Sequence, residues 1–325
     1  GSGISQPYSP WLRYEFVKRN GYDLDSHLPA LFEDNVEADW FLHDAAKVRF
    51  DYYSTLRELW IENFMKPMQK WCKAHNIRLT GHFMDDEWPL VTGYVTSPSV
   101  MANHEYMDWP GIDMLQGSHM TEKPWDPLWL IMLEASGAAN QLGKERVLTE
   151  AFGAGGWDQT IADFKRNGDW LLANGINFFC CHLTYASYLG ARKRDHPQSF
   201  DWREPWWQEF GQLCDYFARV SVISTLSRAH NRILVLHPTL SGYLCPVREE
   251  VDSLVDGDLC RKPDMSGYFE LLKALRRGLW DFDLGDEFIL KNHGVCSTEG
   301  LTVGQQTYRV IILPREASSM LSSTM

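Results

Sequence analysis

Carboxylates and a histidine are concentrated in one short stretch of the chain, residues 78–88. The apolar residues at its start predict a strand that ends near His82, and Asp85, Asp86 and Glu87 follow directly. Barrels built from alternating strands and helices place their chemistry just beyond the carboxyl ends of the strands. The stretch therefore predicts one part of an active site.

A second stretch has the same character, because residues 146–150 predict a short strand that ends on Glu150. Cleavage of a glycosidic bond needs one carboxylic acid to protonate the leaving oxygen and one carboxylate on the opposite side of the anomeric carbon. We therefore predict catalysis by Glu87 and Glu150, with Asp86 as the alternative to Glu87. A salt bridge or a helix cap at the barrel end is the alternative role for Glu150.

Three further polar residues end predicted strands and should lie on the same rim. His82, Asp113 and His182 are expected to bind the hydroxyl groups of a sugar, as is Asp86 if Glu87 is the acid. Packing inside the protein is the alternative for the histidines, and a loop cap is the alternative for Asp113.

Aromatic and basic residues near these strand ends suggest further contacts with a sugar. The chain has 14 tryptophans, and an indole ring stacks its apolar face on a sugar while its N–H remains available. Trp157, next to the glycine-rich turn 153–156, is the preferred platform. Tyr185 and Arg192 lie in a predicted rim loop, residues 183–204, where Arg192 could bind a uronic acid or simply be solvated.

No cofactor is predicted with certainty. The acidic run Asp85–Glu87 could hold a hard cation such as Ca²⁺, which prefers oxygen ligands. A metal-dependent hydrolase that uses this run with His82 and His182 is a further alternative, although the spacing of these residues does not single it out.

The order of the predicted elements indicates the architecture. Helices over 37–75, 127–142 and 157–173 alternate with strands that end near His82, Asp113, Glu150 and His182. This rhythm predicts an α/β fold with a (β/α)8-type barrel. Only four of the eight strands of such a barrel are predicted, so the barrel is expected to be incomplete in this chain. Asp158 is the expected N-cap of its helix, and the apolar strand 175–182 is expected to be buried on both faces.

The pattern changes near residue 228. We assign residues 1–228 to the catalytic barrel, as its C-terminal portion, and residues 229–325 to a smaller flavodoxin-like α/β domain. The strands expected there are 232–238, 280–284 and 308–313, with a helix over 269–279.

Composition limits the partners. The formal net charge is −12 and no block is rich in Lys or Arg, which argues against nucleic acid and against an anionic membrane surface. No apolar run is long enough to predict a membrane span. A carbohydrate is the expected partner, a homo-oligomer stays open, and so does the cellular compartment. The seven cysteines are expected to be buried free thiols.

Several motifs together resemble a known family. They are Thr80-Gly-His82, Pro110-Gly-Ile-Asp113, Arg146 to Trp157, Asp169-Trp170 and Arg192 to Asp195. In this order they resemble glycoside hydrolases related to the calcium-dependent α-L-rhamnosidases of family 106. The later segments 232–238 and 308–314 are similar to the amidotransferase-like domain that follows the barrel in family 42 β-galactosidases.

The resemblance implies a (β/α)8 barrel, a glutamate pair and removal of a terminal sugar. The expected function is therefore a glycosidase that cleaves a rhamnoside- or galactoside-like terminal sugar from a plant or microbial glycan. The alternative is a carbohydrate-binding protein or a degenerate, inactive barrel.

Overall fold

The computed structural model describes residues 6–33, 44–83, 99–114, 125–194, 196–244 and 265–317, without the side chains of 125–127. The helices are α1 Pro10–Asn20, α2 Ala45–Trp60, α3 Lys66–Ala74, α4 Val100–Asn103, α5 Trp125–Leu142, α6 Ile161–Ala173, α7 Trp207–Leu226, α8 Thr239–Tyr243, α9 Ser266–Arg277 and α10 Glu287–His293. The strands are β1 Thr80–Gly81, β2 Trp109–Met114, β3 Leu148–Ala151, β4 Phe178–Cys181, β5 Ile233–His237, β6 Phe282–Asp286, β7 Gly294–Ser297, β8 Gly300–Val303, β9 Gln306–Tyr308 and β10 Val310–Ile312. Short 3-10 helices are η1 Asp25–Leu31, η3 His104–Tyr106 and η5 Gly190–Arg194, and η2 Ile61–Met65 is a π-helical turn.

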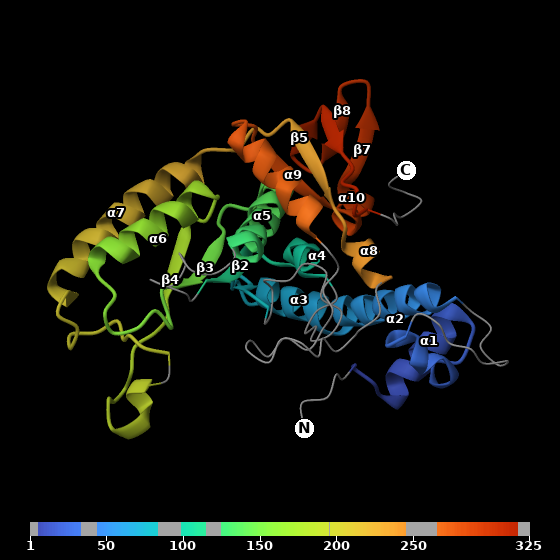
Figure 1. The fold of residues 1–325 in the computed structure, drawn as a ribbon, viewed down its shortest axis with the longest axis horizontal. Coiled ribbons are helices and arrows are strands. Elements are labelled where there is room, and N and C mark those ends of the chain that lie inside the picture. The colour runs from blue at the N-terminus through green and yellow to red at the C-terminus, as the bar shows by residue number, and fades with distance from the viewer. Residues whose placement is uncertain are drawn as a thin grey trace.

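The first sheet contains the four strands expected from the sequence. All are parallel and lie in the order β1-β2-β3-β4. The sheet curls into half of a barrel, with α5, α6 and α7 beside it (Figure 1). Its register places Asp113 of β2 next to Glu150 of β3, and Glu150 next to Cys180 of β4. The predicted incomplete (β/α) barrel is confirmed at this level of detail.

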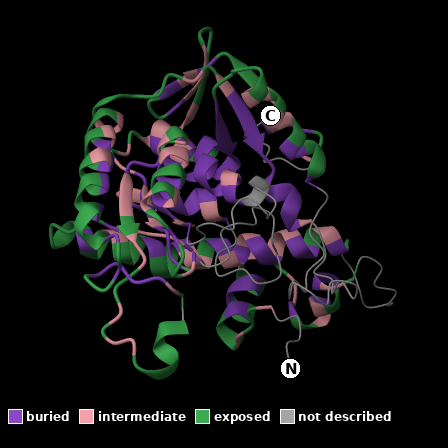
Figure 2. Cartoon of the chain, turned by 60° about the vertical axis from the view of Figure 1, so that its left-hand side comes forward, coloured by how far each residue is buried: buried purple, intermediate pink, exposed green. Residues whose placement is uncertain are grey.

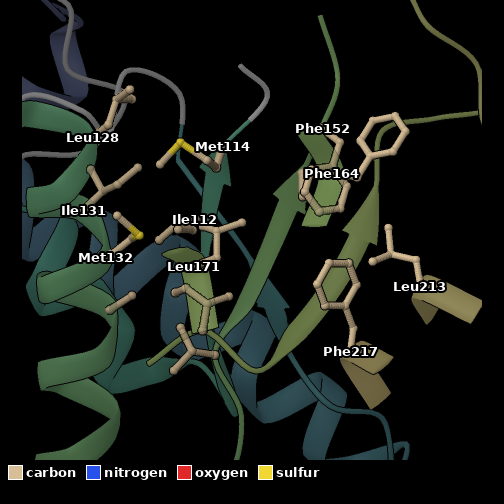
Figure 3. Close-up of a cluster of buried hydrophobic side chains, with 14 of the residues drawn as sticks. Ile112, Met114, Leu128, Ile131, Met132, Phe152, Phe164, Leu171, Leu213 and Phe217 are labelled. Atoms are coloured by element: carbon tan, nitrogen blue, oxygen red, sulfur yellow. The ribbon is translucent and has the colours of Figure 1, made fainter. Parts of the chain in front are cut away.

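Alternation along the strands separates the core from the site. Ile112 and Met114 of β2 are buried and point toward Ile131 and Met132 of α5 (Figure 3). Because successive side chains of a strand point to opposite faces, Asp113 points to the face away from α5. The apolar residues of β2 therefore anchor the strand, and the anchoring fixes the direction of the carboxylate.

Local sequence signals explain where the elements begin. Helix α1 starts after Ser9, whose hydroxyl accepts from Leu12 N, and ends at Gly21 with φ 82°, as expected for a Ser N-cap and a left-handed Gly C-cap. Helix α6 begins one turn later than expected. Thr160 and Asp163 form a reciprocal capping box, so the expectation that Asp158 is the N-cap is wrong. The side chain of Thr160 reaches the free N–H of Asp163, and Asp158 precedes it in the turn.

The other boundaries differ in detail. The helix expected over 37–75 is the continuous series α2, η2 and α3, with Pro67 in the first turn of α3, a position that tolerates proline. Within the stretch expected as a loop, 88–110, α4 and η3 occur and β2 already starts at Trp109.

Strand β4 is more exposed than the sequence predicts. Its residues are half-buried, and Cys180 is exposed. The described residues place no strand on its far side, so the apolar run lies at a sheet edge rather than between two layers. The expectation of buried thiols is correspondingly wrong for Cys180, Cys214 and Cys296, although all five described cysteines are free and Cys72 is buried.

The C-terminal part contains two small sheets. Strands β10, β5 and β6 are parallel in that order, and β7, β8 and β9 form an antiparallel sheet. The expected strands 232–238, 280–284 and 308–313 correspond to β5, β6 and β10. A separate flavodoxin-like domain is not shown, and the boundary at residue 228 stays a prediction.

Helix α5 packs against both parts of the molecule. It contacts β2 on one side and β6 on the other. Leu130, Leu133 and Ala138 belong to the apolar cluster that also holds Leu234 of β5 and Leu284 of β6. Buried residues gather around α5 and along these strands, whereas η5 is exposed (Figure 2). In the part of the chain that the structure describes, no helix has the length and apolar character needed to cross a bilayer.

Candidate active site

The carboxyl ends of the four parallel strands bring together four residues that the sequence placed on one rim. His82 follows β1, Asp113 lies near the end of β2, Glu150 lies in β3 and His182 follows β4. The strands are neighbours in space in the same order as in the chain. One residue from each strand therefore contributes to one polar cluster.

Glu150 is the centre of this cluster. His82 Nε2 lies 2.7 Å from Glu150 Oε2, and His182 Nε2 lies 3.4 Å from Glu150 Oε1. The other nitrogen of His82, Nδ1, lies 3.7 Å from Asp113 Oδ2. The four side chains are between 18% and 29% exposed. The cluster is thus held by internal contacts while a ligand can still reach it.

The two carboxylates have different surroundings. Burial raises the pKa of Asp113, and the nearby Glu150 charge adds to the rise, whereas His82 opposes it. Glu150 instead has an imidazole nitrogen within 3.4 Å of each of its oxygens. A carboxyl group whose burial favours its protonated form, next to a carboxylate held by two imidazoles, suits acid–base chemistry.

The turn after β3 is held in an unusual conformation. Phe152 and Ala154 have positive φ angles of 68° and 55°, and each such residue costs about 1–3 kcal/mol when it is not glycine. Gln198 Nε2 donates to Phe152 O at 3.0 Å. Gly153 lies against His182, because a Cβ there would be 2.6 Å from His182 Nδ1. The expectation that glycine permits a tight turn beside Glu150 stays a prediction, because the left-handed residues next to Glu150 are Phe152 and Ala154.

Trp157 and Tyr185 form part of an aromatic cluster on the rim. The centroid of the Trp157 ring lies 6.1 Å from that of Tyr185 and 5.2 Å from that of Tyr188. Trp157 Nε1 donates to the carbonyl of Lys193 at 3.2 Å. Arg192 is exposed in η5, which extends beyond the carboxyl end of β4 (Figure 1).

Three acidic residues of the predicted site lie in a part of the chain that is not described, and two residues near the site were not predicted. Asp86 and Glu87 lie outside the described residues, as does Asp85. His196, whose ring is 5.4 Å from that of His182, and Tyr188 were missed. Both lie in the loop after β4, where no periodic pattern marks them.

His82, Asp113 and Glu150 could together bind a metal ion, because their ligand atoms lie within 4.8 Å of one another. The resemblance implies calcium, which takes about six to eight oxygen ligands. This group offers two carboxylates and an imidazole, and His82 is already bonded to Glu150. The described residues therefore do not fit a calcium site.

A cleft of about 580 Å³ lies at the other end of the sheet. Its lining includes Lys144, Asn177 and Asp283. Asp283 accepts hydrogen bonds from Asn140, Asn231 and Tyr308 at 2.7–2.9 Å. Because its central polar groups already have partners, this cleft is a weaker candidate than the strand ends.

Comparison with known proteins agrees with the arrangement. Residues 5–236 match the profile of the α-L-rhamnosidases of glycoside hydrolase family 106. The chain belongs to this family. A Formosa agariphila protein with the provisional name β-glucuronidase is 26% identical over 212 residues, which is 63% of this chain and 16% of that protein.

Two solved structures share the fold of this chain. A rhamnosidase from Novosphingobium sp. PP1Y superposes with a TM-score of 0.67 at 19% identity, over 97% of this chain and 28% of that one. A catalytic mutant of a family 42 β-galactosidase from G. stearothermophilus gives a TM-score of 0.51 at 13% identity, over 86% of this chain and 43% of that one. The chain thus spans less than half the length of each protein. These likenesses show that the fold is shared.

Proposed function

We propose that the protein is a glycosidase that removes a terminal rhamnoside-like sugar from a plant or microbial glycan. The observation that carries the proposal is the contact of Glu150 with His82 at 2.7 Å and with His182 at 3.4 Å, at adjoining strand ends. Membership in the rhamnosidase family supports the choice of sugar.

The proposed chemistry assigns one carboxylate to each side of the anomeric carbon. Glu150, in its ionised form, either attacks that carbon or removes a proton from the attacking water. His82 and His182 orient it and can also donate to sugar hydroxyls. Glu87 is proposed to protonate the leaving oxygen, and Asp113, whose burial favours the protonated form, is the alternative donor.

The proposal is tested by assaying the purified chain with aryl α-L-rhamnosides, aryl β-D-galactosides and aryl β-D-glucuronides. Turnover of the rhamnoside is expected. Glu150→Gln keeps the shape of the side chain but removes its charge and basicity, and should lower kcat about 10³-fold. Glu209→Gln, in the exposed first turn of α7, is the matched control and should keep full activity.

The acid is identified separately. Glu87→Gln and Asp113→Asn are compared on a good and a poor leaving group, because loss of the proton donor harms the poor leaving group more. Sugar binding without turnover in the parent chain would favour the carbohydrate-binding alternative. Absence of both would overturn the proposal.

A further inference from the structure

Three aromatic rings from two loops pack together beside the strand ends. Trp157 comes from the loop after β3, and Tyr185 and Tyr188 come from the loop after β4. The rings of Tyr185 and Tyr188 are 5.8 Å apart at 86°, and each contacts Trp157. Trp157 remains 43% exposed. The cluster therefore presents an open indole surface supported by two phenol rings.

Buried polar groups hold the cluster in place. Ser199 donates from its hydroxyl to Asp201 at 2.7 Å and accepts from Tyr185 N at 2.8 Å. Arg203 donates to Asp201 at 2.8 Å, and its guanidinium lies 4.7 Å from the ring centroid of Tyr188. Ser199 and Asp201 are 0% and 6% exposed. A loop with so many internal bonds is preorganised, which lowers the cost of ordering it on binding.

We propose that Trp157, Tyr185 and Tyr188 form a subsite for a neutral pyranose on the leaving-group side of the bond that is cleaved. This inference rests on the proposed function. A glycosidase that removes a terminal sugar holds only that sugar in its pocket, here at Glu150, His82 and His182. A second platform, on the loops that follow β3 and β4, is then placed to contact the sugar that departs.

The chemistry of the cluster selects this ligand. The apolar face of a pyranose stacks on an indole, and the hydroxyl and N–H groups of tyrosine and tryptophan remain at the ring edges for polar contacts. Arg203 is neutralised by Asp201, and Tyr188 also donates to the buried Glu204 at 3.4 Å. An uncharged sugar fits this surface better than an acidic one.

The test compares two substrates that carry the same terminal sugar. α-L-Rhamnosyl fluoride has a single atom as its leaving group, and a rhamnosyl glucoside disaccharide has a pyranose. Trp157→Ala should lower kcat/KM at least about tenfold on the disaccharide and less than about threefold on the fluoride. Trp157→Phe retains a stacking ring and should restore most of the loss. Trp280→Ala, which removes a tryptophan that is 62% exposed elsewhere, should change neither substrate.

Equal losses on both substrates, or no loss on either, would overturn the subsite. If the parent chain cleaves neither substrate, the proposed function fails, and calorimetric binding of the same disaccharide decides the subsite independently. Binding that Trp157→Ala abolishes would support it. No binding to the parent chain would refute it.

Discussion

The backbone of Gly153 lies directly against the imidazole of His182. A Cβ at position 153 would be 2.6 Å from Nδ1 and 2.8 Å from Cβ of that histidine, closer than packed atoms can approach. The turn after one strand therefore fixes the position of a site residue that follows the next strand.

Gly153→Ala should displace His182 from Glu150. Overpacking of this kind costs about 1–3 kcal/mol, and we expect turnover to fall with stability. Thermal unfolding and kcat/KM are the measurements. Gly211→Ala is the control, because Gly211 lies inside α7 with no atom within 4 Å of the added Cβ, and it should stabilise by about 0.5–1 kcal/mol. Normal activity in Gly153→Ala would show that His182 is not held this way.

His82→Ala should lower kcat/KM about 100-fold, because small displacements of a reacting group cost about this much. The variant removes the nitrogen that lies 2.7 Å from Glu150. Initial rates on the best aryl glycoside provide the measurement. His75→Ala, an exposed histidine at the end of α3, is the control. A loss of less than threefold would show that His82 does not contribute to catalysis.

Asp113 should make stability depend on pH. Burial raises its pKa above the ordinary 3.8, so the folded protein holds this proton more tightly than the unfolded chain does. The resulting stabilisation is complete below about pH 4 and is lost as the pH rises through the higher, folded-state pKa. Asp113→Asn should therefore gain in Tm relative to the parent chain between pH 4 and pH 7. Asp158→Asn, an exposed control, should show no such trend, and an opposite trend for Asp113→Asn would contradict the assignment.

A buried polar contact joins α5 to β5. His237 Nε2 lies 3.2 Å from Glu134 Oε1, and both side chains are at most 2% exposed. Burial raises the pKa of Glu134. His237→Ala leaves this buried carboxyl without its partner and should cost about 1–3 kcal/mol in urea unfolding.

Two comparisons make that measurement specific. Glu134→Gln keeps the shape without the titratable carboxyl and should cost less than His237→Ala. Glu270→Ala removes a surface partner of Lys273 and should cost about 0–1 kcal/mol. If His237→Ala costs no more than Glu270→Ala, the contact between His237 and Glu134 does not stabilise the packing of α5 against β5.

The sequence predicts the meeting of His82, Asp113, Glu150 and His182 because parallel strands share one carboxyl end. It predicts less about the loops. The contacts of Tyr188, Ser199 and His196 depend on the path of residues 183–206, and no periodicity encodes that path. The platform role of Trp157 and Tyr185, and the roles of Asp86, Glu87 and Arg192, remain predictions.

Two errors have a common physical origin. The run that forms β4 is apolar throughout, which is typical of a strand between two layers, but only the fold shows that it lies at an edge. Asp158 and Thr160 are both good cap residues, and only the reciprocal bond with Asp163 decides between them. In each case the deciding contact lies outside the pattern that was used.

The two sides of α5 bear on any attempt to divide the protein. Leu130 and Leu133 are covered by residues that lie beyond position 228. A polypeptide that ends at residue 228 would expose this apolar face of α5 to water, and we expect it to accumulate in inclusion bodies. Co-expression with a second polypeptide that starts at residue 229 should return it to the soluble fraction.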